Sequence, residues 1–131
     1  MNNMERPDFF TLKNGDKAKL PFTDQEYKRR LDNLRNVMDK NNLDMVILTS
    51  MHNIAYHTGF IYCSFGRPYG CVITKNKINT ISANIDASQP WRRSICDNVI
   101  YTDWKRDNYL KAIVSILGKD KLPKNIGIEN D

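Results

Sequence analysis

The chain has 131 residues, of which 40% are hydrophobic and 27% are charged, and its formal net charge is +5. This balance is typical of a folded globular domain, and the length suffices to bury one core without disulfides or metals. No apolar run approaches the roughly 20 residues that span a bilayer, and the first residues lack the pattern of a signal peptide. We therefore expect a cytoplasmic protein with no membrane partner.

The positive charge raises the question of nucleic-acid binding. The lysines and arginines are dispersed along the chain in short groups, and no known nucleic-acid module accompanies them. Dispersed charges of this kind are typical of solvated protein faces. We expect no nucleic-acid partner.

The residue types that most often carry chemistry form no complete catalytic set. Cys63, Cys71 and Cys96 are odd in number and form no CxxC pair, so we interpret them as reduced thiols that fill the core. His52 and His57 are five residues apart, which on a helix places them about 140° from each other, so they cannot share a metal ion. The sequence also lacks a GxSxG motif and a glycine-rich loop before a helix. No cofactor is expected from this chain.

The first predicted element is a helix that begins after Thr23. Thr23 and Glu26 have the spacing of a capping box, and Phe22 and Tyr27 have the spacing of a hydrophobic staple. The residues that recur at helical spacing to form the expected apolar face are Tyr27, Leu31, Leu34, Val37 and Met38. The helix is predicted to end near Asn41.

Shorter elements follow in alternation. Residues 45–49 form an apolar run that predicts a buried strand, and a short helix is expected between Ser50 and Gly59, which suit its two caps. Residues 69–74 and 78–83 then predict a hairpin.

The last third of the chain repeats the alternation of strand and helix. Residues 98–102 predict a strand, Asp103 or Asp107 is expected to cap the next helix, and Gly118 is expected to close it. The apolar face of that helix is expected to comprise Tyr109, Leu110, Ile113, Ile116 and Leu117. The tail KNIGIEND, residues 124–131, begins like a further strand and then stops. We predict an α/β domain of three-layer type, with a mixed central sheet flanked by helices.

The stretch CSFGRPYG, residues 63–70, places a cation just before a predicted strand. The planar guanidinium of Arg67 suits a carboxylate or a phosphate, and Phe65 offers an apolar wall, so the stretch could form one side of a pocket for a small anion. The alternative is an ordinary turn at the start of a strand with a surface arginine, since glycine and proline are common in turns.

Several segments, taken in order, resemble the amino-terminal domain of the creatinase family, which belongs to the pita-bread superfamily together with the Xaa-Pro peptidases. They are NGDK at 14–17, EYKRRLDNLR at 26–35, LTSMHNIAYHTGFIYCSFGRPYG at 48–70, ISANIDASQPWRRS at 81–94, YTDWKRDNY at 101–109 and IGIEND at 126–131. The resemblance covers nearly the whole chain from Asn14 onward. Its most specific parts are YCSFGRPY, ANIDASQPWRRS and YTDWKRDNY.

The resemblance implies that residues 1–131 are a truncated amino-terminal domain, whose carboxy-terminal pita-bread domain, absent from this sequence, holds the catalytic residues. Creatinases are homodimers in which the small domain of one subunit reaches over the active site of the other. By the SFGRP motif, Phe65 would pack on creatine and Arg67 would bind its carboxylate. The full-length enzyme is then expected to hydrolyse creatine, or a related guanidino acid, to sarcosine and urea without a metal. This chain alone is expected to be inactive.

Two alternatives stay open at this point. The chain could be the amino-terminal domain of a metal-dependent Xaa-Pro dipeptidase or aminopeptidase, whose two metal ions lie in the other domain, because YHTGF at 56–60 is similar to that wider superfamily. It could also be a stand-alone interaction module without a catalytic partner.

Overall fold

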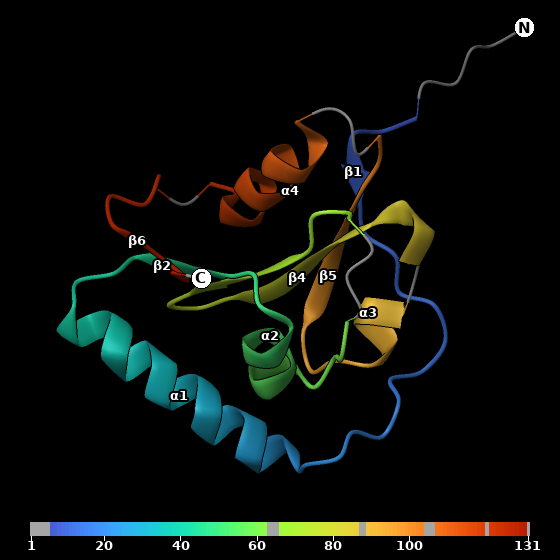
Figure 1. Ribbon diagram of the computed structural model, residues 1–131. Helices are drawn as coiled ribbons and strands as arrows, with labels where there is room; N and C mark the ends of the chain where they lie inside the picture. The colour runs from blue at the N-terminus through green and yellow to red at the C-terminus, as the bar shows by residue number, and fades with distance from the viewer. Residues whose placement is uncertain (1–5, 63–65, 87–88, 104–106, 120, 131) are drawn as a thin grey trace, which may run out of the picture.

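A mixed six-stranded sheet lies between two layers of helix in the computed structural model, which describes residues 6–62, 66–86, 89–103, 107–119 and 121–130 (Figure 1). The strands are β1 (Phe9–Phe10), β2 (Met45–Leu48), β3 (Gly70–Thr74), β4 (Ile78–Ala83), β5 (Asp97–Tyr101) and β6 (Ile126–Ile128). Their order across the sheet is β1-β5-β4-β3-β2-β6. The pairs β4-β5 and β2-β6 are parallel, and the other neighbours are antiparallel.

The helices cover both faces of this sheet. They are α1 (Asp24–Lys40), α2 (Met51–Thr58), α3 (Gln89–Arg92), α4 (Asn108–Leu117) and the 3-10 helix η1 (Asn84–Asp86). In Figure 1, α1 and α2 lie below the sheet and α4 lies above it. Each side has its own buried core, one with Leu31, Ile54 and Ile73 among its members, the other with Val72, Ile113 and Ile116. The predicted three-layer α/β class with a mixed sheet is confirmed.

Helix α1 begins as its sequence predicts. The Thr23 hydroxyl accepts a hydrogen bond from the Glu26 amide at 3.2 Å, and the Phe22 and Tyr27 rings meet edge to face with centroids 6.1 Å apart. The expected apolar face is wrong at Val37, whose surface is 52% exposed. At 100° per residue, Val37 lies about 80° around the helix from Tyr27, outside the stripe that contacts the sheet.

The predicted caps of α2 form as expected, whereas the predicted N-cap of α4 forms no side-chain hydrogen bond. Ser50 caps α2 and Gly59 ends it in the left-handed conformation, as predicted. Asp107 stands at the N-cap of α4 but its side chain makes no capping hydrogen bond. Leu110 is 56% exposed, which corrects its place on the predicted apolar face.

The two cysteines that the structure describes agree with their prediction. Cys71 and Cys96 are free and buried, as predicted, while Cys63 lies outside the described residues. Strand β1 was not predicted, because two residues are too few to show a period. Within the described part of the chain, none of the helices combines the length and the apolar content that a membrane span requires.

The strand register brings distant segments to one edge of the sheet. Leu48 at the end of β2 pairs with Cys71 near the start of β3, and Gly70 pairs with Ile81 near the end of β4. Ala83 in turn pairs with Tyr101, because β4 and β5 are parallel. The segments that follow β2, β4 and β5 therefore meet the segment that precedes β3.

Candidate functional site

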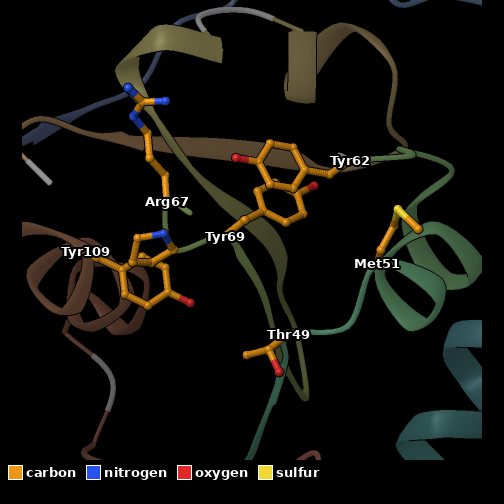
Figure 2. Close-up of a pocket in the computed structure, with 7 residues that line it drawn as sticks. Thr49, Met51, Tyr62, Arg67, Tyr69 and Tyr109 are labelled. Carbon is orange, nitrogen blue, oxygen red and sulfur yellow. The ribbon is translucent and has the colours of Figure 1, made fainter. Parts of the chain in front are cut away.

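A pocket of about 320 Å³ opens at this edge (Figure 2). It is lined by Thr49, Met51, Tyr62, Arg67, Pro68, Tyr69 and Tyr109. Thr49 and Met51 come from the junction of β2 and α2, and Tyr109 comes from the first turn of α4. The remaining residues belong to the segment between α2 and β3. The pocket is thus assembled from three parts of the chain.

Arg67 supplies the positive charge of the pocket. It is half-buried, and its side chain forms no hydrogen bond or ion pair with another residue that the structure describes. Gly66, directly before it, has φ of 82°, a left-handed conformation that glycine adopts without the steric cost of a side chain. Among the described residues, none occupies the donors of the guanidinium.

Two tyrosines stack to form an apolar wall. The rings of Tyr62 and Tyr69 have centroids 4.0 Å apart and planes only 18° apart, and both side chains are buried. The Tyr69 hydroxyl has no hydrogen-bond partner among the described residues. Burial raises the pKa of Tyr69, so this hydroxyl is neutral at physiological pH.

Two further tyrosines fix the backbone on the other side of Arg67. The hydroxyl of Tyr101 donates a hydrogen bond of 2.5 Å to the carbonyl oxygen of Pro68. Tyr109 packs edge to face against Tyr101, with ring centroids 5.4 Å apart, and its hydroxyl lies so close to Gly70 that a Cβ there would be 2.5 Å from it. Only glycine leaves room for this contact.

Asp86, at the end of η1, adds a negative charge next to the pocket. Burial raises the pKa of its carboxyl, while a hydrogen bond from Tyr62 and the positive charge of Arg67 act in the opposite direction. One carboxylate oxygen, Oδ2, is buried and accepts no hydrogen bond from any described residue.

A second carboxylate, Glu129, follows β6 and accepts hydrogen bonds from the junction of β2 and α2 beside the pocket. Its oxygens accept hydrogen bonds from the backbone amides of Thr49 and Ser50 at 2.6 and 2.5 Å, from the Ser50 hydroxyl at 2.9 Å, and from the Asn53 side chain. Burial acts to raise the pKa of Glu129, but these hydrogen bonds outweigh it and lower the pKa to about 2. Glu129 thus joins β6 to the start of α2.

The sequence predicted part of this site. Arg67 lines a pocket, as one of the two interpretations of CSFGRPYG required, whereas Phe65 lies outside the described residues. Its substrate-binding role and that of Arg67 stay predictions. The sequence reasoning did not single out Tyr62, Tyr69 or Asp86, although all three lie in segments that carry the family resemblance.

The pocket offers one cation beside aromatic surface, which suits a small anion with an apolar body. Within the residues that the structure describes, no three His, Cys, Asp or Glu side chains gather as metal ligands would. We therefore identify a candidate binding site here and assign no reacting group to it.

The sequence profile of the Creatinase/Prolidase N-terminal domain family matches residues 30–131. The chain belongs to this family. Among curated relatives, the creatinase of Bacillus sp. (strain B-0618) is 48% identical over 118 residues, which make up 89% of this chain and 29% of that relative. The chain therefore spans less than a third of the length of the relative it matches.

Solved structures share the fold. A proline dipeptidase from Streptococcus pneumoniae TIGR4 matches with a TM-score of 0.66 at 17% identity, over 76% of this chain and 73% of that one. An Xaa-Pro aminopeptidase from Streptococcus pyogenes matches with a TM-score of 0.65 at 19% identity, over 83% of this chain and 78% of that one. At these identities the likeness establishes the architecture and carries no information about substrate.

Proposed function

We propose that the chain is the amino-terminal domain of a creatinase-type amidinohydrolase, which converts creatine and water to sarcosine and urea. The observation that carries this proposal is the 48% identity to a curated creatinase over 118 residues. The identity to the peptidases of known structure is much lower, at 17 and 19% for the two compared above. The chemistry itself would belong to residues outside this chain.

In this proposal Arg67 binds the carboxylate of creatine and Phe65 packs on the substrate, in an active site that a partner subunit completes. Support comes from the half-buried guanidinium, which has no partner among the described residues, and from the neighbouring tyrosine wall. An arginine paired with a carboxylate in a desolvated site forms strong, directional hydrogen bonds. The wall and the cation occupy one side of the ligand, so a second surface must cover the other side.

The test is urea release from creatine by the complete protein that carries this domain. Arg67→Ala should lower kcat/KM by at least about 30-fold, because removing one partner of a desolvated charge pair costs about 2 kcal/mol or more. Arg29→Ala is the matched control, because Arg29 pairs with Glu26 on the exposed face of α1 and should leave turnover unchanged. Wild-type efficiency in Arg67→Ala would refute the proposed role of Arg67.

An Xaa-Pro dipeptidase or aminopeptidase is the second candidate, because the matching family joins creatinases with prolidases. The same preparation should therefore be assayed on Xaa-Pro peptides, with and without added divalent metal. Peptide cleavage without urea release from creatine would overturn the amidinohydrolase proposal and support the peptidase. The isolated chain should show neither activity and should bind creatine weakly, because one wall of a pocket leaves most of the ligand in water.

A further inference from the structure

Asp86 has a carboxylate oxygen without a hydrogen-bond donor, and Arg67 has N–H groups without an acceptor, among the described residues. The Oδ2 atom of Asp86 is buried, and no described residue donates a hydrogen bond to it. Arg67 is the cation whose charge acts on this carboxylate. In Figure 2 the Arg67 side chain extends toward the ribbon of η1, the 3-10 helix that follows β4.

An unpaired buried carboxylate oxygen is costly, because the water that it loses on folding is not replaced. Such atoms are rare in native proteins, and each one calls for a physical explanation. Arg67 has N–H donors to spare, since none of them bonds to another described residue.

The Asp86 carboxylate interacts with a buried pair of tyrosines. Tyr62 donates a hydrogen bond to Asp86, and the Tyr62 ring is held by its stack on Tyr69 at a centroid distance of 4.0 Å. Both tyrosines are more than nine-tenths buried. Through Tyr62, Asp86 is linked to this buried tyrosine pair.

We propose that Asp86 is a positioning residue for Arg67, which holds one edge of the guanidinium and thereby turns the other edge toward the carboxylate of the ligand. A guanidinium has two such edges, and each can bond a carboxylate with parallel N–H groups. Tyr62 orients Asp86 through its hydroxyl. This inference rests on the proposed function of Arg67 and adds Asp86 and Tyr62 to it.

A structural role for Asp86 makes a different prediction. If Asp86 only fixed η1 to Tyr62, its replacement by asparagine would weaken the fold and would affect turnover equally with or without Arg67. A positioning role requires the two residues to be coupled. In the complete protein, Asp86→Asn should raise KM for creatine about 10-fold and change kcat less than twofold. In the Arg67→Ala background the same substitution should have no further effect, and Asp86→Glu should restore part of the loss.

A second measurement needs no turnover. In the 131-residue chain labelled with ¹⁵N, the Arg67 Nε–H signal, assigned by its loss in Arg67→Lys, reports how firmly the guanidinium is held. Asp86→Asn should speed the exchange of this proton with water at least threefold, and Tyr62→Phe should do so to a lesser extent. Asp16→Asn, at an exposed aspartate of the amino-terminal segment, is the control and should leave the exchange unchanged.

The outcomes separate this inference from the function on which it rests. Faster exchange in Asp86→Asn together with no turnover of creatine by the wild type would keep the positioning role and overturn the amidinohydrolase proposal. Unchanged exchange together with loss of turnover in Arg67→Ala would keep the function and overturn the role of Asp86. Equal losses from Asp86→Asn with and without Arg67 would also overturn that role.

Discussion

The hydroxyl of Tyr101 donates a 2.5 Å hydrogen bond to the carbonyl oxygen of Pro68 and so fixes the residue that follows Arg67. Tyr101 is almost fully buried at the end of β5, and burial raises its pKa, so that the hydroxyl remains a donor at neutral pH. The backbone of the candidate ligand-binding segment is thus held by a strand that lies two positions away in the sheet.

Tyr101→Phe should lower the free energy of unfolding by about 1 kcal/mol, because one hydrogen bond is lost while the ring remains. Urea denaturation of the 131-residue chain measures this change. Tyr109→Phe is the matched control, because the Tyr109 hydroxyl donates no hydrogen bond to the described part of this segment and packs against Gly70 instead. Equal stability of Tyr101→Phe and the wild type would contradict the anchoring role.

Gly70→Ala should destabilise the chain by about 1 to 3 kcal/mol, because the new Cβ would lie 2.5 Å from the Tyr109 hydroxyl and force the ring to move. The double variant Gly70→Ala with Tyr109→Phe should recover much of that loss, because the clashing oxygen is gone. Thermal unfolding of Gly70→Ala, of Tyr109→Phe and of the double variant measures both effects. Failure of the second substitution to rescue the first would show that the strain lies elsewhere, for example at the Leu48 carbonyl 3.4 Å away.

The Glu129 carboxylate should make stability depend on pH at the acidic end. Its pKa is about 2 in the folded chain against an ordinary value of 4.5, so the carboxylate favours the folded state above about pH 4.5. This contribution is lost as the pH falls through 2. The stability difference between wild type and Glu129→Gln, measured by urea denaturation, should be constant above pH 5 and shrink toward pH 2. A difference independent of pH would contradict the assignment.

Lys17 ties the amino-terminal segment to the segment around α3. Its ammonium donates hydrogen bonds to the backbone carbonyls of Trp91, Ser94 and Cys96 at 2.6, 3.0 and 2.6 Å. Lys17→Met should lower the free energy of unfolding by about 1 to 2 kcal/mol. The loss is smaller than for a fully buried cation, because the Lys17 side chain is partly solvated. Lys19→Met, at an exposed position nearby, should change the urea midpoint little. Similar effects of the two substitutions would exclude a specific clamp.

The fold was largely predictable because its signals are local. The cap at Thr23, the staple of Phe22 on Tyr27 and the left-handed end at Gly59 depend on residues a few positions apart. The errors at Val37 and Leu110 have a common physical origin. A helix that packs on a sheet buries a stripe, and apolar residues at the border of the stripe are left exposed.

Of the described residues in the candidate site, the sequence predicted only Arg67. Arg67 is conspicuous in the sequence because it stands among glycine, proline and aromatic residues. Asp86 and Tyr101 come next to it because β4 and β5 are parallel and adjacent in the sheet, and no local pattern reports strand order. Tyr62 and Tyr69 flank CSFGRPYG in the sequence, but their stacking depends on how the segment between α2 and β3 folds back.

Glu129, the residue that follows β6, connects this strand to the pocket. The amide of Thr49 donates to this carboxylate, and the Thr49 side chain is part of the pocket wall. One side chain, Glu129, therefore connects the end of β6 both to the pocket wall at Thr49 and to the first turn of α2.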